Sequence, residues 1–178
     1  MAPRRSIISK LLLSLALLLL PLGSALALRV GQTVNTVQVR DSNNRPASIP
    51  DLGKKVLTIF YTDPDVKDQN EPFRDLLKAA NLDKDKYRGL GVVNMKDTWK
   101  PNWAIRRVVR QKEAKFNSLI LTDPDYSLKK AWDLGDCDEK DIAIVIGKDR
   151  KVYYLKAGKM TPEENQRGLK LIKELMAK

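Results

Sequence analysis

The chain has 178 residues and a formal net charge of +11, with 33 Lys or Arg, 22 Asp or Glu, no His and a single Cys. The absence of His excludes Ser-His-Asp and Cys-His nucleophiles, His-ligated zinc, copper or haem, and the usual proton shuttle near neutral pH. One Cys excludes an intramolecular disulfide.

The first 27 residues have the three parts of a secretory signal peptide. Arg4, Arg5 and Lys10 precede an apolar run from Leu11 to Leu22, and Ala25-Leu26-Ala27 is a small-x-small cleavage site. The run is shorter than the ~20 residues that a membrane-spanning helix needs, so an uncleaved anchor is the less favoured alternative. We therefore predict cleavage at the end of this segment, and no Cys follows it to carry a lipid.

Cleavage would leave residues 28–178, which we predict to form a single domain of 151 residues with a net charge of +8. No later hydrophobic run is long enough to insert stably into a membrane. The basic excess favours an envelope protein, an anionic surface component or a polyanion as partner, and in an exported protein nucleic acid is not expected. The alternative is that the Lys residues only keep the protein soluble.

The first half of this domain predicts strands joined by a helix. Val34, Val37 and Val39 suggest short strands before a turn at 42–46. Residues 56–61, VLTIFY, predict a buried strand, which is followed by a Pro- and Asp-rich turn and a helix with apolar residues at 73, 76 and 77. Residues 90–95, LGVVNM, predict a second strand that is covered on both faces and parallel to the first.

A basic helix is predicted from Trp103 to Phe116, with Asn102 as its N-cap. The apolar residues on its predicted buried face are Ile105, Val108, Val109 and Phe116. A third strand at 119–121 and a short helix at 126–134 follow.

The last part of the chain predicts a β-hairpin and a helix. Residues 141–146 and 151–155 are strand-like and flank the turn Gly-Lys-Asp-Arg. Thr161-Pro162-Glu163-Glu164 has an N-cap residue, a Pro at the first helical position and a capping-box Glu. The predicted buried face of this helix comprises Leu169, Ile172, Leu175 and Met176.

This order of elements resembles a thioredoxin-like α/β fold, a mixed central sheet flanked by helices. The segment from Gly31 through Leu-Gly-Lys to Val-Leu-Thr-Ile-Phe-Tyr is similar to the opening of redoxins and peroxiredoxins. The stretches TDPDYSLKKAWDL and AIVIGKDRKVYYLKAGKMTPEE resemble the YtfJ family of exported proteobacterial proteins, most strongly from Lys115 to Glu164. The resemblance implies a periplasmic protein and brings no catalytic residue and no cofactor.

Redox chemistry in this fold uses a Cys-x-x-Cys pair where the first strand meets its helix. Here the corresponding positions are Asp65 and Asp68, and the place of the usual cis-Pro falls at about Asp141. We therefore do not expect a disulfide oxidoreductase. Cys137 is flanked by three carboxylates, which disfavour a thiolate, so we expect an exposed or half-buried bystander thiol. The alternative is a thiol-dependent redox or antioxidant role through mixed disulfides of Cys137.

An acidic cluster follows the predicted buried strand: Asp63, Asp65, Asp68 and Glu71. Its oxygens would suit Ca²⁺ or Mg²⁺, but the spacing lacks the Gly and final Glu of an EF-hand loop. Acidic residues at this place also cap a helix and complement its dipole. We favour capping and keep a metal site as the weaker alternative. The motif Thr-Asp-Pro-Asp recurs at 122–125, again after a strand, which two similar turns explain.

The best candidate for a binding surface is the basic helix, through Arg106, Arg107, Arg110, Lys112 and Lys115. Arg side chains bind carboxylate and phosphate groups, and Trp99 and Trp103 could serve as aromatic anchors. The alternative is that these cations only form a solvated helix face. For Trp103 and Trp132, helical spacing favours positions in the core. The sequence thus favours a non-enzymatic binding protein of the cell envelope.

Overall fold

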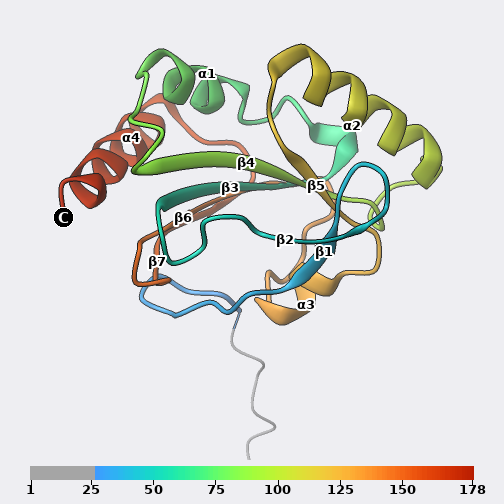
Figure 1. Cartoon of the computed structure of the whole chain (residues 1–178), viewed down its shortest axis with the longest axis horizontal. Helices are drawn as coiled ribbons and strands as arrows, with labels where there is room; N and C mark the ends of the chain where they lie inside the picture. Colours follow the sequence, from blue (N-terminus) through green and yellow to red (C-terminus); the bar gives the residue numbers. More distant parts are fainter. Residues whose placement is uncertain (1–26) are drawn as a thin grey trace, which may run out of the picture.

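The computed structural model describes residues 27–178, which form one α/β unit around a seven-stranded sheet (Figure 1). The predicted signal peptide lies outside the described residues, except for its last residue. Within this described part, no helix is long and apolar enough to cross a membrane.

The sheet is mixed, with strand order β2-β1-β5-β4-β3-β6-β7. Its strands are β1 (Gln38–Arg40), β2 (Pro46–Ser48), β3 (Val56–Thr62), β4 (Tyr87–Asn94), β5 (Ile120–Asp123), β6 (Asp141–Ile146) and β7 (Val152–Ala157). The strands β3, β4 and β5 are parallel, whereas β6 and β7 form an antiparallel hairpin. The predicted mixed sheet, parallel crossover and hairpin are therefore confirmed.

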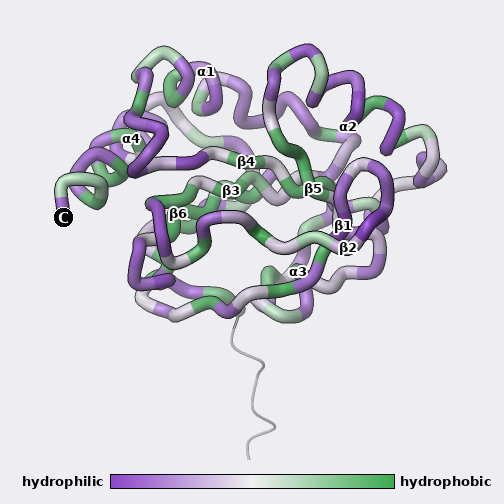
Figure 2. Tube along the Cα trace, viewed as in Figure 1, coloured by the Kyte–Doolittle hydropathy of each residue, from purple (hydrophilic) through white to green (hydrophobic). Residues whose placement is uncertain are grey.

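Strand β3 lies inside the sheet and all seven of its residues are buried. Leu57, Ile59 and Tyr61 point to one face, whereas Val56 and Phe60 point to the other, as the two-residue period of a strand requires. Figure 2 shows hydrophobic segments concentrated along these central strands. Since β3 carries apolar side chains on both faces, it needs cover on both.

Helices provide this cover. They are the 3₁₀ helix η1 (Pro64–Val66), α1 (Glu71–Ala79), α2 (Asn102–Phe116), α3 (Ser127–Ala131) and α4 (Pro162–Met176). In Figure 1, α1, α2 and α4 lie on one side of the sheet, and α3 lies on the other with the segment that precedes β1. Helix α4 begins with the predicted capping box of Thr161 and Glu164, which is confirmed.

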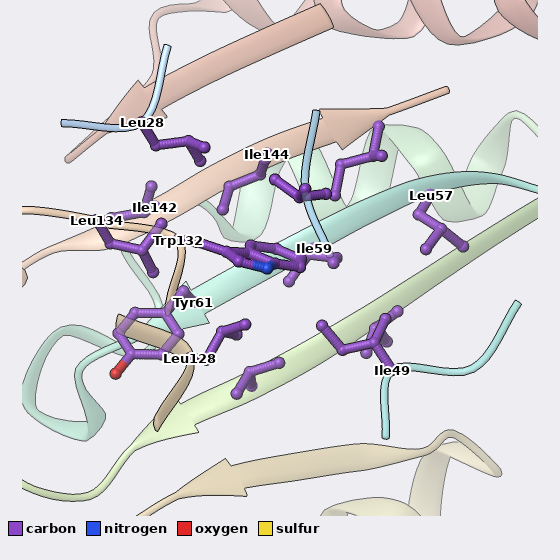
Figure 3. Close-up of a cluster of buried hydrophobic side chains, with 14 of the residues drawn as sticks. Leu28, Ile49, Leu57, Ile59, Tyr61, Leu128, Trp132, Leu134, Ile142 and Ile144 are labelled. Atoms are coloured by element: carbon purple, nitrogen blue, oxygen red, sulfur yellow. The ribbon is translucent and has the colours of Figure 1, made fainter. Parts of the chain in front are cut away.

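Trp132 lies in the core on the α3 side of the sheet. It is 2% exposed and lies among apolar side chains that include Ile59 and Ile144 (Figure 3). Its indole Nε1 donates a hydrogen bond to the carbonyl oxygen of Asn35 at 2.9 Å, so the polar atom of this large side chain is satisfied. The predicted core position of Trp132 is confirmed.

The core on the other side joins α1 to α4. Phe73 is fully buried there, and its ring packs edge-on against Phe60 with 5.8 Å between ring centroids. A Cβ added to Gly168 of α4 would lie 2.8 Å from Cζ of Phe73, closer than packed atoms approach. The glycine thus allows the two helices to approach closely at this point.

The predicted buried face of α2 is partly wrong. Ile105 and Val109 are buried, but Val108 and Phe116 are exposed, and Pro101 rather than Asn102 is the N-cap. Ile105 and Val109 are four residues apart, so they form one narrow stripe, and they pack with Met95, Val93 and Ile120 in a small separate cluster. Only this stripe of α2 packs against the sheet, so Val108 and Phe116 on other sides of the helix remain exposed.

Asn70, the N-cap residue of α1, ties this helix to β6 and to the segment that joins β7 to α4. Its side chain is buried, and Nδ2 donates to the carbonyl oxygens of Asp141 at 3.0 Å and Gly158 at 3.1 Å. Its Oδ1 accepts a hydrogen bond from the backbone N–H of Met160 at 2.8 Å. One amide therefore satisfies three backbone groups from β6 and the connection between β7 and α4.

We expect Asn70→Ala to lower the free energy of unfolding by about 3 kcal/mol, because three backbone groups lose a partner worth about 1 kcal/mol each. Urea denaturation followed by circular dichroism measures the loss. Asn165→Ala is a matched control, since Asn165 is also buried but its Oδ1 has no hydrogen-bond partner. Equal losses in the two variants would contradict the bridging role of Asn70.

Candidate functional site

The junction between β3 and the following helices is where thioredoxin-like enzymes carry their cysteines, and here Asp63 organises it. The carboxylate of Asp63 is fully buried and accepts hydrogen bonds from the backbone N–H groups of Asp65 and Glu139, both at 2.8 Å. Burial raises the pKa of Asp63. The favoured capping role is confirmed for Asp63, which caps η1.

The two aspartates that the sequence predicts at the positions of the redox cysteines are paired with lysines. Asp65 forms an ion pair with Lys100, and Asp68 forms one with Lys67 at 2.5 Å. In each case the hydrogen bond from the lysine lowers the pKa of the carboxyl group, so both aspartates stay ionised. Glu71 lies in the first turn of α1. Throughout residues 27–178, no three Cys, Asp or Glu side chains gather as metal ligands would.

Asp141 lies across from this junction, at the first position of β6 and opposite Thr62 of β3. Its side chain is fully buried. The Thr62 hydroxyl donates to Oδ1 at 2.6 Å, and Nη2 of Arg74 lies 2.8 Å from Oδ2. The Arg74 guanidinium also stacks 4.2 Å from the ring centroid of Phe60. Burial raises the pKa of Asp141, and the charge of Arg74 opposes this shift.

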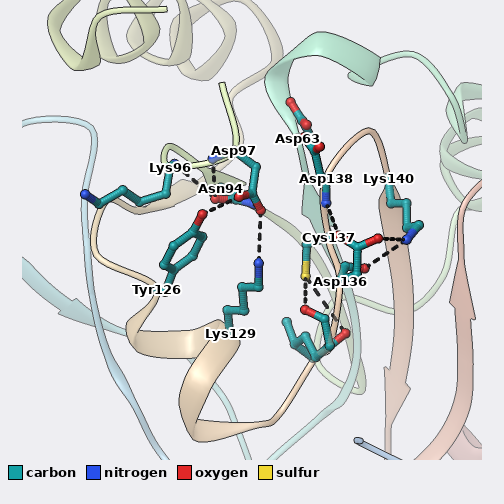
Figure 4. A network of polar contacts seen from close by, with 12 residues as sticks. Asp63, Asn94, Lys96, Asp97, Tyr126, Lys129, Asp136, Cys137, Asp138 and Lys140 are labelled. Carbon is teal, nitrogen blue, oxygen red and sulfur yellow. Dashed lines mark hydrogen bonds and ion pairs between the residues drawn. The ribbon is translucent and has the colours of Figure 1, made fainter. Parts of the chain in front are cut away.

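Cys137 is completely buried, so the predicted exposed or half-buried thiol is wrong. Its Sγ lies 3.5 Å from the carbonyl oxygen of Gly135 and 3.9 Å from that of Leu134 (Figure 4). Burial raises the pKa of the thiol to about 11, and the nearby ammonium of Lys129 only partly opposes this shift. The main cause is therefore desolvation rather than the neighbouring carboxylates on which the sequence argument relied.

The fold brings the Cys137 loop to the β3 junction, although the two segments are far apart in sequence. Asp63 makes the connection, because its Oδ2 accepts from Glu139 and its backbone N–H donates to the carbonyl oxygen of Lys140 at 3.0 Å. The thiol itself packs in the core on the α3 side of the sheet. The loop that carries Cys137 is thus joined to the β3 junction, but the thiol itself is buried.

The repeated Thr-Asp-Pro-Asp motif performs the same task at both sites. Asp123, like Asp63, is fully buried at the end of a parallel strand. Its carboxylate accepts the hydroxyl of Tyr61 at 2.9 Å and the backbone N–H groups of Ser127, Leu128 and Lys129 in α3. The repeat therefore marks a buried carboxylate that caps the next helix, as two similar turns predict.

A second polar cluster fixes the loop that follows β4. Asp97 accepts hydrogen bonds from the Tyr126 hydroxyl, from Asn94 Nδ2 at 2.5 Å and from Lys129 Nζ at 3.2 Å (Figure 4). Burial acts against ionisation of Asp97, but these three donors outweigh it and lower its pKa. The loop is thereby held against the start of α3. Sequence reasoning missed this cluster, since its members come from two segments, 94–97 and 126–129, that are far apart in the chain.

The five cations of the predicted binding surface divide into two groups. Arg106 donates to Oδ1 of Asn44 at 2.7 Å and Arg110 donates to the carbonyl oxygen of Ser42 at 2.8 Å, so both hold the turn between β1 and β2. No side-chain hydrogen bond or ion pair joins the other three, Arg107, Lys112 and Lys115, to another residue of the described chain, although Lys115 Nζ lies 5.2 Å from the ring centroid of Phe116. Arg107 and Lys115 are exposed and can contact a partner, whereas Lys112 is half-buried.

Trp103 is 68% exposed, so the core position predicted for it is wrong. It lies in the first turn of α2, two residues before Ile105, and therefore on the opposite side of the helix from the buried stripe. Trp99, in the loop before α2, is 85% exposed. Of the six large hydrophobic side chains that the described chain exposes, five lie between Trp99 and Leu119. We call Trp99, Trp103, Arg107 and Lys115 the α2 surface; Lys112 is half-buried and lies on the side of the helix that carries the buried stripe.

Residues 50–175 match the sequence model of a family described as "Bacterial protein of unknown function (YtfJ_HI0045)". The chain belongs to this family. It is 27% identical over 180 residues to the "Uncharacterized protein YtfJ" of Escherichia coli strain K12, an alignment that covers 93% of this chain and 97% of the relative. The expected YtfJ membership is confirmed.

Solved structures similar to this family member are thioredoxin-like. The exposed lipoprotein thioredoxin Etrx1 of Streptococcus pneumoniae superimposes with a TM-score of 0.58 at 19% identity, covering 79% of this chain and all of that chain. A putative thiol:disulfide interchange protein DsbE of Chlorobium tepidum superimposes with a TM-score of 0.60 at 12% identity, covering 84% and 99%. The predicted thioredoxin-like fold is confirmed.

We expect Arg74→Met to destabilise the protein by roughly 3–5 kcal/mol at pH 7, because Asp141 is left as an unpaired buried charge. Without Arg74, the pKa of the buried Asp141 carboxyl in the folded state is raised further above its unfolded-state value than it is in the wild type. The folded variant then binds a proton at Asp141 more tightly than the unfolded chain does. Its free energy of unfolding is therefore highest below the unfolded-state pKa of Asp141, and it falls as pH rises through the folded-state pKa. Urea denaturation at several values from pH 4 to 8 measures this slope.

The double variant Arg74→Met/Asp141→Asn is the control for this prediction. It removes both charges of the pair, so it should recover stability near pH 7 relative to Arg74→Met and lose the added pH dependence. A single variant whose stability rises with pH, or a double variant with an unchanged slope, would refute the assigned ion pair.

The raised pKa of Cys137 predicts slow alkylation in the folded protein. A thiol with a pKa of about 11 in place of 9.0 has about 100-fold less thiolate at pH 8, and burial blocks access as well. Iodoacetamide labelling followed by mass spectrometry should therefore be at least about 100-fold slower in buffer than in 6 M urea. Labelling at comparable rates would show that the thiol is accessible.

Proposed function

We propose that this protein is an exported, periplasmic binding protein that recognises a component of the cell envelope through the α2 surface, without enzymatic chemistry. The observation that carries the proposal is the pair of exposed tryptophans beside unpaired cations, because exposed aromatic and Arg side chains are the usual anchors of a binding surface. The fold supplies a rigid support for these side chains.

The position of the α2 surface supports this role. Trp99 lies in the loop that follows β4, and its neighbour Lys100 pairs with Asp65 at the β3 junction. The surface thus begins at the carboxyl ends of the parallel strands, where open α/β sheets usually bind ligands. Recognition would use the edge of the fold at which thioredoxin-like enzymes carry their cysteines.

The chemistry of the remaining groups argues against the rival role of Cys137 in thiol exchange. A nucleophilic thiolate requires a lowered pKa and access, whereas this thiol is buried and its pKa is raised. The aspartates at the redox positions are ion-paired and have no redox chemistry. A non-covalent role is consistent with both facts.

Two observations support export. The first 27 residues have the pattern of a cleavable signal peptide. Similar structures include an exposed lipoprotein thioredoxin and a DsbE-type thiol:disulfide interchange protein, by the names that those proteins carry. Export would present the α2 surface to membrane and envelope components.

Photo-crosslinking in living cells tests the proposal. A photo-crosslinking amino acid replaces exposed Gln111 of α2, and a second strain carries it in place of exposed Lys170 of α4. We expect an envelope component to be captured from position 111 and not from position 170. Capture should survive Cys137→Ala and fall about tenfold with Arg107→Glu/Lys115→Glu, which reverses two charges that form no ion pair within the described chain.

Two outcomes would contradict the proposal. Equal capture, or no capture, from both positions would show that the α2 surface is not used for binding. Capture that disappears in Cys137→Ala and under reducing conditions would assign the contact to a mixed disulfide and replace this proposal with the thiol-dependent role.

A further inference from the structure

We propose that the partner of the α2 surface is an anionic phospholipid bilayer, against which Trp99 and Trp103 insert at the level of the headgroups. This inference rests on the proposed function and names the envelope component that is recognised. Two features of the structure support it: the exposure of the two indoles and the charge of the segment that carries them.

The two tryptophans have the exposure that interfacial anchoring requires. Trp99 is 85% and Trp103 68% exposed, whereas the core residue Trp132 is 2% exposed. Trp side chains favour the boundary between headgroups and acyl chains, because the ring is apolar and its N–H still reaches a polar partner. Exposed Val108 adds apolar area on the same helix.

The charge of this segment favours an anionic surface. Residues 95–119 contain seven Lys or Arg and only two acids, Asp97 and Glu113. Both acids are engaged in the fold, since Asp97 accepts from Tyr126 and Lys129 and Glu113 accepts the backbone N–H of Ile120 at 2.9 Å. A Lys or Arg near an anionic bilayer contributes about 1 kcal/mol of attraction. The segment therefore attracts anionic lipid and carries few free acids that would repel it.

Two other occupants fit less well. A second copy of the chain would place one cationic α2 surface against another, and like charges repel. A bound peptide usually lies in a groove or along a strand edge, whereas both indoles protrude, with exposed fractions of 85% and 68%. Protruding indoles beside cations match a flat anionic surface better than either.

Binding to lipid vesicles tests the inference, using residues 28–178, which contain every element of the fold. Vesicles of pure phosphatidylcholine are compared with vesicles that contain 30% phosphatidylglycerol, by co-sedimentation and by tryptophan emission. We expect binding only to the anionic vesicles, a blue shift of emission on binding, and at least about tenfold weaker binding when NaCl rises from 50 to 500 mM.

Variants assign the binding to the α2 surface. Trp99→Ala/Trp103→Ala should weaken binding at least about tenfold and abolish the blue shift, because its remaining Trp132 is already buried. Arg107→Glu/Lys115→Glu should weaken binding at least about tenfold. Lys170→Glu/Lys173→Glu on α4 makes the same change in net charge at exposed positions and should bind like the wild type.

The inference is overturned if anionic vesicles do not bind, if phosphatidylcholine vesicles bind equally well, or if the α4 variant loses as much affinity as the α2 variant. Capture of a protein from position 111 in cells, without vesicle binding, would overturn the lipid partner and leave the proposed binding function standing. Loss of capture in cells would instead contradict the proposed function itself.

Discussion

The structure depends on keeping buried carboxylates satisfied at one edge of its sheet. Asp63, Asp123 and Asp141 are all fully buried, at the ends of β3 and β5 and at the start of β6. Backbone N–H groups serve the first two, but Asp141 relies on Thr62 and on the one guanidinium of Arg74. An unpaired charge at such a depth is costly. The placement of α1, which carries Arg74, is therefore coupled to the start of β6 by charge as well as by apolar packing.

This coupling lies at the strand-helix junction where the sequence predicts the counterpart of the redox site of thioredoxin-like enzymes. In thioredoxin-like enzymes a cysteine pair at the first strand-helix junction faces a cis-Pro across the sheet edge. In this chain the junction aspartates pair with lysines, and the facing position is Asp141 with its ion pair. The one thiol is near this edge but within the core, where burial raises its pKa. Ion pairs thus occupy the positions at which the sequence predicts the redox pair and the cis-Pro of thioredoxin-like enzymes.

Patterns of short range in the sequence predicted the fold well. The buried strand at 56–61, the hairpin from residue 141 and the capping box at Thr161 each depend on neighbours within a few positions, and each is confirmed. The misassigned residues are those whose environment depends on distant segments. Cys137 is buried because its loop is tied to Asp63, and Trp103 is exposed because only a narrow stripe of α2 meets the sheet. Helical spacing states which residues share a face, but the width of the covered stripe is set by the neighbouring elements.

Helix α2 separates the residues that stabilise the fold from those available for recognition. Ile105 and Val109 attach it to the sheet, and Arg106 and Arg110 hold the turn between β1 and β2. Trp103, Arg107 and Lys115 alternate with these residues in sequence but face outward. Because the two sets occupy different sides of one helix, substitutions on the outward side should leave the packing of the helix on the sheet intact. The same separation explains how a scaffold with ion-paired aspartates at its first strand-helix junction can still present exposed tryptophans beside exposed cations on α2.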